Sequence, residues 1–227
     1  MNIAENLRAV TTRIEAAAQR AGHTVRLVAV SKTKPAADVA QLAALGQLAF
    51  GENYVQEALR KQRELAAMKA SGGELEWHMI GPLQSNKARE VALHFDWLQT
   101  LDRVKLVAPL ERLRPDNAPP LNVLIQVNID DEASKSGCAP AAIDALAAAI
   151  VAAPRLKLRG LMAIPAPADL AQRARAFART RELYEGLLAA HAGVDTLSMG
   201  MSDDFELAIE HGATLVRVGS ALFGARV

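Results

Sequence analysis

The pattern that most restricts the fold of this chain is a repeated alternation of short apolar segments with longer amphipathic ones. After a leading helix predicted over residues 2–21, eight stretches rich in Val, Leu and Ile each precede a helical pattern. We expect strands at residues 25–31, 48–51, 75–80, 96–101, 121–128, 156–164, 196–198 and 214–218. Regular strand–helix alternation is typical of a parallel sheet, and eight repeats are the number that closes a (β/α)8 barrel.

An open, doubly wound sheet is the competing α/β architecture. That fold usually has fewer strands and a glycine-rich turn after the first one. Here the first turn reads Ser-Lys-Thr-Lys-Pro (31–35) and contains no glycine. We therefore predict an α/β fold of the (β/α)8 TIM barrel type with an extra N-terminal helix, which Asn2 caps and Gly22 ends. No linker or composition shift divides the chain, so residues 1–227 are expected to form a single domain.

Composition narrows the possible classes of protein. The 227 residues carry 26 basic and 25 acidic side chains, a balance that argues against a dedicated nucleic-acid binder. The single cysteine, Cys138, excludes an internal disulfide and a cysteine-only zinc cluster. No apolar run reaches the length of a membrane span, and the N-terminus lacks the pattern of a signal peptide. We expect a globular, cytoplasmic protein that binds neither nucleic acid nor a membrane.

The candidate reactive group is Lys32, at the end of the first predicted strand. Alternation along a strand places Val28, Val30 and Lys32 on one face. If that face lines the barrel interior, burial disfavours the charged ammonium and leaves an amine able to attack an aldehyde. The alternative is that Lys32 extends past the strand end into water. Lys34 has the same parity but precedes a helix, so we expect it to be solvated.

The ends of the last two strands form a candidate anion site. The eighth strand ends Arg-Val-Gly-Ser (217–220) before a one-turn helix, and the seventh ends Ser-Met-Gly-Met-Ser (198–202). Glycines let backbone N–H groups approach an anion, and a phosphate cup from loops seven and eight plus a short helix is common in this fold. The alternative is a tight turn at Gly219 with Ser220 as an ordinary N-cap. We favour the phosphate cup and expect Ser202 to cap the helix that follows it.

Arg217 shares strand parity with Leu215 and Gly219, and we predict that it points inward. A buried arginine needs a partner, because an unpaired buried charge is costly. That partner is either a core acid such as Asp195 or an acceptor on a ligand at the barrel axis. An imine-forming lysine, a phosphate cup and an inward arginine together match the aldehyde, phosphate and pyridine nitrogen of pyridoxal 5′-phosphate (PLP).

Seven sequence motifs follow one another from the first strand to the C-terminus. They are VSKTKP (30–35), FGENY (50–54), WHMIGPLQSNK (77–87), SKSG (134–137), RGLMAI (159–164), SMGMSDD (198–204) and RVGSALFGAR (217–226). On these motifs the chain resembles the PLP homeostasis protein family, also called the YggS/PROSC family. The resemblance implies a barrel like the N-terminal domain of alanine racemase, with PLP held on Lys32 as an internal aldimine.

The resemblance also implies roles for residues at the strand ends. The residues implied to hold the phosphate are Ser198, Ser202, Gly219 and Ser220. The residues implied to lie beside the ring are Asn53, Met199 and Met201, and Arg217 is implied to face the pyridine nitrogen. No metal site is implied, and no pattern of metal-ligand spacing occurs in the sequence.

Two features favour a carrier of PLP over a catalyst. Alanine racemase continues into a β-rich domain that supplies a tyrosine as a second acid/base, whereas this sequence stops one turn after the eighth strand. An arginine against the ring nitrogen also weakens the cofactor as an electron sink. We expect a protein without catalytic residues that buffers PLP and hands it to PLP-dependent apo-enzymes, as a monomer or weak homodimer. The alternatives are an amino-acid racemase and an aldolase-like barrel in which Lys32 binds a phosphosugar.

Other polar residues are assigned structural roles. His78 alternates with Ile80, and we expect a hydrogen-bonded core histidine there. Lys87 and Lys135 are the alternative attachment points if Lys32 is unmodified. Cys138, in a predicted loop, is expected to be unreactive. A solvated outer helix face is expected for the basic residues Arg60, Lys61, Arg63 and Lys69.

Overall fold

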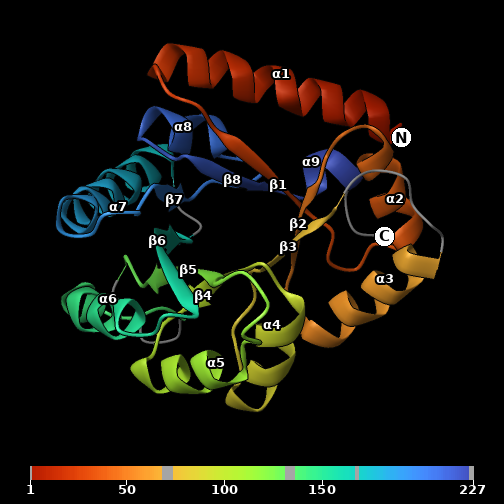
Figure 1. Ribbon diagram of the computed structural model, residues 1–227. Helices are drawn as coiled ribbons and strands as arrows, with labels where there is room; N and C mark the ends of the chain where they lie inside the picture. Colours follow the sequence, from red (N-terminus) through yellow and green to blue (C-terminus); the bar gives the residue numbers. More distant parts are fainter. Residues whose placement is uncertain (1, 68–73, 131–135, 167–168, 225–227) are drawn as a thin grey trace.

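The computed structural model describes residues 2–67, 74–130, 136–166 and 169–224. Within these residues, eight parallel strands close into a barrel in sequence order, and β1 pairs with β8 (Figure 1). The strands are β1 (Arg26–Val30), β2 (Ala49–Glu52), β3 (Glu76–Met79), β4 (Trp97–Leu101), β5 (Leu121–Val127), β6 (Leu156–Ala163), β7 (Thr196–Ser198) and β8 (Leu215–Val218). The predicted (β/α)8 barrel is confirmed.

Helices cover the outside of the barrel (Figure 1). They are α1 (Ile3–Ala21), α2 (Ala36–Ala44), α3 (Val55–Ala67), α4 (Ala88–His94), α5 (Val107–Leu113), α6 (Ile143–Val151), α7 (Leu170–Ala190), α8 (Phe205–Glu210) and α9 (Ser220–Phe223). The 3-10 turns η1 (Ser85–Lys87), η2 (Val104–Leu106) and η3 (Pro140–Ala142) lead into α4, α5 and α6. Within the described ranges, none of the helices is both long enough and apolar enough to cross a bilayer.

The extra helix α1 lies across the outside of β1, next to α8 and α9 (Figure 1). Its ends are those predicted: the Asn2 side chain accepts a hydrogen bond from the Ala4 amide, and Gly22 adopts the left-handed conformation that closes the helix. The buried side chains Val10, Ile14 and Ala17 form its apolar stripe. The helix therefore covers the seam at which the first and last strands of the barrel meet.

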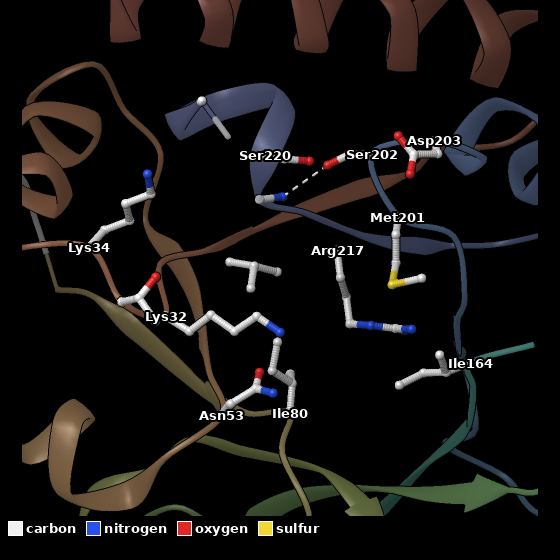
Figure 2. Close-up of a pocket in the computed structure, with 14 residues that line it drawn as sticks. Lys32, Lys34, Asn53, Ile80, Ile164, Met201, Ser202, Asp203, Arg217 and Ser220 are labelled. Carbon is white, nitrogen blue, oxygen red and sulfur yellow. Dashed lines mark hydrogen bonds between the residues drawn. The ribbon is translucent and has the colours of Figure 1, made fainter. Parts of the chain in front are cut away.

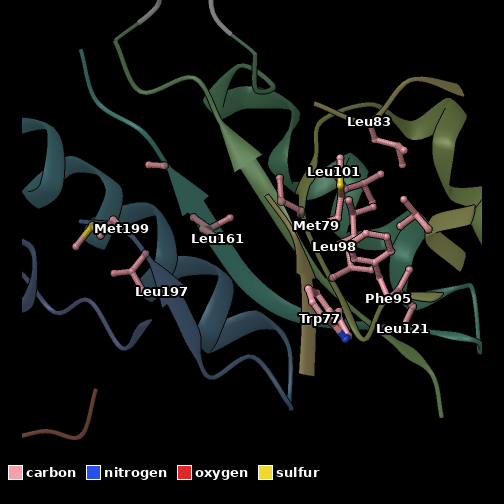
Figure 3. Packing of buried hydrophobic residues seen from close by; sticks show 14 of the residues in the cluster. Trp77, Met79, Leu83, Phe95, Leu98, Leu101, Leu121, Leu161, Leu197 and Met199 are labelled. Carbon is pink, nitrogen blue, oxygen red and sulfur yellow. The ribbon is translucent and has the colours of Figure 1, made fainter. Parts of the chain in front are cut away.

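The apolar core has an outer layer and an interior. The outer layer, between strands and helices, includes Trp77, Leu98 and Leu161 (Figure 3). Two smaller clusters of buried residues stand apart from that layer, Val28 with Ala49 and Leu215, and Trp97 with Leu124 and Met162. Strand parity places them inside the barrel, where side chains from alternate strands form layers. This filling leaves room for a pocket at the C-terminal end of the strands.

Candidate functional site

A pocket with a volume of about 270 Å³ opens at the C-terminal end of the barrel. Seven of the nine predicted site residues line it, namely Lys32, Asn53, Met201, Ser202, Arg217, Gly219 and Ser220. The pocket is also lined by residues that were not predicted as site residues, namely Val30, Thr33, Lys34, Ile80, Ile164, Asp203 and Gly224. Barrel closure explains this convergence, because the carboxyl ends of all eight strands meet at one rim.

Lys32 follows β1 and extends toward the centre of the pocket (Figure 2). Val30 also lines the pocket, and Val28 lies below in the barrel interior, so the predicted strand parity is confirmed. The side chain of Lys32 is half-buried. Lys34 is half-buried as well, and its ammonium donates to the Phe223 carbonyl at 3.2 Å. Lys34 is therefore less solvated than expected, because its ammonium contacts the last residue of α9.

Carboxylates from β2 and α3 hold the residues on both sides of Lys32. The Ser31 hydroxyl donates to Glu52 Oε1 at 2.6 Å, and the Thr33 amide donates to Glu57 Oε1 at 2.5 Å. Thr33 is in the left-handed region with φ 65°, which costs a residue with a Cβ roughly 1 kcal/mol or more. The hydrogen bond to Glu57 stabilises this conformation and so fixes the direction in which the chain leaves Lys32.

The prediction that Lys61 lies on a solvated helix face was wrong. Instead of lying on a solvated face, its side chain is only 1% exposed and its ammonium contacts Glu52 Oε1 at 2.7 Å and Glu57 Oε1 at 2.8 Å. The residue shares the buried face of α3 with Val55, Ala58 and Leu65, a spacing of three and four that was visible in the sequence. Burial raises the pKa of Glu52, and the Lys61 ammonium opposes that change.

Ser202 joins the loop after β7 to the turn after β8. Its hydroxyl accepts hydrogen bonds from the amides of Gly219 and Ala221, each at 3.3 Å, and the first of these is drawn in Figure 2. The prediction that Ser202 caps the next helix was wrong: Asp204 is the N-cap residue of α8, and its carboxylate accepts from the Met201 amide at 2.7 Å. Two amides of the β8–α9 turn therefore point at Ser202, and Ser202, Gly219 and Ser220 line the pocket together, where a glycine-containing turn before a helix is a candidate anion site.

Gly219 permits a close approach between β1 and β8. A Cβ atom at this position would lie 3.3 Å from both the Cβ atom and the carbonyl oxygen of Val30, tighter than most such contacts. The φ of −121° is accessible to any residue, so space rather than backbone conformation requires glycine here. At Gly219 the pocket wall is thus built from main-chain atoms alone.

Arg217 reaches the pocket from β8 and is only 3% exposed, as its strand parity predicted (Figure 2). Its guanidinium donates to the Ser198 hydroxyl at 2.6 Å and to the Ala163 carbonyl at 3.0 Å. Asp195, considered as its partner, instead pairs with Arg159 at 2.5 Å, and no described carboxylate lies within salt-bridge distance of Arg217. Burial lowers the pKa of Arg217 to about 10, so the group remains a cation at neutral pH.

Two predicted site residues lie away from the pocket wall. Ser198 is fully buried beneath the pocket, and its hydroxyl is engaged by Arg217 and by Gln99 Oε1 at 2.7 Å. Met199 is fully buried in the outer core layer between the strands and the helices (Figure 3). Strand alternation turns Met199 outward, away from the barrel interior, whereas Ser198 points inward but is held by Arg217 and Gln99, and neither residue lines the pocket.

The structure also places the remaining polar candidates. His78 is a fully buried, hydrogen-bonded core histidine, as predicted, and its ring stacks on Trp97 with centroids 5.2 Å apart. Lys87 lies 3.9 Å from Glu90, away from the pocket. Cys138 is buried, and that burial raises the pKa of its thiol to about 11. Lys69 and Lys135 lie outside the described residues.

The donor set of the pocket fits the three functional groups of PLP. Lys32 offers an amine for the aldehyde, the buried Arg217 guanidinium offers N–H donors for the pyridine nitrogen, and the β8–α9 turn with Ser202 offers donors for the phosphate. A buried cation without a paired carboxylate is costly unless a ligand or hydrogen bonds compensate it, which is consistent with a site whose ligand presents an acceptor atom to Arg217.

Comparisons with known proteins agree with this assignment. The model of the family described as alanine racemase, N-terminal domain, matches residues 6–227. A relative from Pseudomonas aeruginosa named pyridoxal phosphate homeostasis protein is 58% identical over 99% of this chain and 96% of its own length. A relative of the same name from Escherichia coli K12 is 52% identical, covering 99% and 97% respectively. The chain belongs to the alanine racemase N-terminal domain family and, within it, to the pyridoxal phosphate homeostasis proteins.

A solved structure supports the same assignment at the level of the whole fold. PipY of Synechococcus elongatus PCC7942, determined with PLP bound, is 36% identical to this chain and superposes with a TM-score of 0.85. The match covers 98% of this chain and 100% of PipY.

Proposed function

We propose that this protein binds PLP in the pocket at the C-terminal end of the barrel and acts in intracellular PLP homeostasis and supply. The observation that carries the proposal is the convergence of Lys32, Arg217 and the Ser202–Gly219 contact on one pocket. The names of the close relatives and the PLP bound to PipY support it.

Each part of the pocket has a distinct task in this proposal. Lys32 Nζ is the point of covalent attachment, and Arg217 faces the pyridine nitrogen. The residues that hold the phosphate are Ser202, Gly219 and Ser220, and those beside the ring are Asn53 and Met201. When bound, PLP supplies an aldehyde and an electron-withdrawing ring.

A carrier role is favoured over catalysis by the surroundings of the ring nitrogen. A guanidinium donates a hydrogen bond without giving up its proton, so Arg217 keeps the pyridine nitrogen unprotonated and weakens the ring as an electron sink. We further propose that the protein acts in the cytoplasm, as a monomer or weak homodimer, and passes PLP to PLP-dependent apo-enzymes.

Absorption spectroscopy and mass spectrometry test the attachment point. Purified protein incubated with PLP should show a visible band that borohydride bleaches, leaving a mass increment on the peptide that contains residue 32. Lys32→Ala should lose the band and the increment while remaining folded, and Lys87→Ala, a control outside the pocket, should keep both. An increment on a different lysine would refute the assignment. A wild-type protein that takes up no PLP would refute the function itself.

Incubation with alanine in deuterated water separates carrier from enzyme. A carrier should show no sustained exchange of the α-hydrogen and no change of optical rotation beyond the PLP-only control. Continued turnover at a constant rate would identify an amino-acid racemase instead.

A further inference from the structure

Five side chains inside the barrel form one continuous series of hydrogen bonds, which we call the interior chain. Arg217 Nη1 lies 2.6 Å from Ser198 Oγ, and Ser198 Oγ lies 2.7 Å from Gln99 Oε1. Gln99 Nε2 lies 2.9 Å from His78 Nδ1, and His78 Nε2 lies 2.7 Å from Glu76 Oε1. The series begins at the pocket on β8 and crosses β7 and β4 to β3.

All the hydrogen bonds of the interior chain point the same way, with each donor on the Arg217 side and each acceptor on the Glu76 side. A guanidinium can only donate, so the Ser198 oxygen accepts from Arg217 and its single hydrogen goes to the Gln99 carbonyl. The Gln99 amide nitrogen must then donate to His78 Nδ1, which leaves the His78 proton on Nε2, donating to Glu76. Turning the Gln99 amide around would place its carbonyl against His78 and require a second proton on that buried ring.

The far end of the interior chain is anchored at the opposite rim of the barrel. Glu76 is the first residue of β3, and Arg26, the first residue of β1, contacts its carboxylate at 2.6 Å. Burial alone would raise the pKa of Glu76, but the hydrogen bond with His78 and the charge of Arg26 outweigh that effect and lower it. The interior chain therefore has a cation, Arg217, at its pocket end and an anion, Glu76, at its far end.

We propose that Gln99 and His78 are positioning residues that hold Arg217 in the orientation needed to meet a ring nitrogen in the pocket. Of the five N–H groups of the guanidinium, the bonds to Ser198 and Ala163 engage two among the described residues, which leaves other donors to address a ligand. The interior chain, rather than a carboxylate, sets the plane and rotation of Arg217. This inference rests on the proposed function, since the ligand it concerns is PLP.

The first test cuts the interior chain at Gln99 without touching the pocket wall. Gln99→Leu is nearly isosteric and removes both side-chain hydrogen bonds of Gln99. Ser198→Ala, which removes a single oxygen, is the second variant in case Gln99→Leu does not fold. Both variants should still take the borohydride-stable mass increment at Lys32, but with at least a tenfold weaker dissociation constant for PLP and a shifted visible band. Thr180→Val, which deletes a buried hydroxyl bonded only within α7, is the matched control and should bind PLP as the wild type does.

The second test measures which ring nitrogen of His78 carries the proton in the protein without PLP, by 15N nuclear magnetic resonance of the histidine side chains. Wild-type His78 should show an unprotonated Nδ1 and a protonated Nε2. Gln99→Glu places an acceptor against Nδ1 and should give a ring protonated at both nitrogens. Adding PLP should move the His78 signals in the wild type and leave them in place in Ser198→Ala.

The outcomes separate the two proposals. Uptake of PLP at Lys32 with an unchanged spectrum and affinity in both cut variants would refute the positioning role and leave the proposed function standing. A His78 ring protonated on Nδ1 in the wild type would contradict the direction of the interior chain. No uptake of PLP by the wild type would instead refute the proposed function.

Discussion

The ammonium of Lys61 donates a hydrogen bond of 2.6 Å to the backbone carbonyl of Ser31, the residue immediately before Lys32. The same ammonium contacts Glu57, whose carboxylate accepts from the amide of Thr33, the residue immediately after Lys32. A buried cation on α3 therefore fixes both neighbours of the proposed attachment point. Local backbone rigidity of this kind orients a side chain that must meet its ligand at one atom.

Replacing Lys61 should strongly destabilise the fold. Lys61→Met leaves the fully buried Glu52 without its counter-charge, so we expect a loss of about 3–5 kcal/mol in the free energy of unfolding, measured with urea. Adding Glu52→Gln to that variant should recover part of the loss. Arg60→Met, whose side chain is 64% exposed, is the matched control and should change stability by less than about 0.5 kcal/mol. A loss below about 1 kcal/mol for Lys61→Met would contradict the role assigned to this ion cluster.

Gly219→Ala should weaken PLP binding. The added methyl group would meet Val30 at 3.3 Å, so β1 or the β8–α9 turn must shift by a few tenths of an ångström. Because that turn carries the amides proposed to hold the phosphate, we expect roughly a tenfold rise in the dissociation constant, equivalent to about 1.4 kcal/mol. Titration followed by absorption measures it. An unchanged affinity would show that the turn does not contact the phosphate.

Gly186→Ala should stabilise the protein and serves as the control for the preceding variant. Gly186 lies within α7, has an ordinary helical conformation and has no atom within 4 Å of the place that a Cβ atom would take. Alanine in a helix interior is favoured over glycine by roughly 0.5–1 kcal/mol. We expect a gain of that size in the free energy of unfolding with no change in PLP affinity. A loss of stability would mean that α7 needs a glycine at this point.

The stability of the fold should depend on pH through His78. Burial lowers the pKa of this ring, against the opposing effect of Glu76, so the native state excludes a proton that the unfolded chain binds below about pH 6.5. The unfolded state then binds more protons, and the free energy of unfolding falls as pH decreases, by up to about 1.4 kcal/mol per unit. His78→Gln can keep both hydrogen bonds and should lack this slope between about pH 5 and 6.5. Equal slopes in urea titrations of the two proteins would contradict the prediction.

Cys138 should react slowly with alkylating reagents in the native state. Burial raises the pKa of its thiol from 9.0 to about 11, which lowers the thiolate fraction at pH 8 by roughly 100-fold. Iodoacetamide should therefore label the native protein roughly 100 times more slowly than the protein unfolded in urea, as followed by mass spectrometry. Comparable rates would contradict the burial of this thiol in the native state.

Several features of the site follow from short-range patterns in the sequence. The inward direction of Lys32 and Arg217 follows from strand alternation, which is a property of neighbouring residues. The caps of α1 and the position of the β8–α9 turn follow from local residue preferences as well. The buried position of Lys61 could have been predicted in the same way, because the residue shares the spacing of the apolar stripe of α3. The prediction of a solvated side chain was based on its charge instead.

The sequence by itself therefore determined the order of strands and helices and the faces from which Lys32 and Arg217 enter the pocket. Only the tertiary structure decided that Ser202 bonds to the β8–α9 turn, and that Ser198 joins Arg217 to Gln99. The physical reason is that these contacts join residues 17 to 99 positions apart, on different strands or on the loops that follow them, and their geometry exists only once the barrel has closed. Hydrogen-bond partners across a closed sheet depend on register and strand neighbours, which local periodicity does not encode.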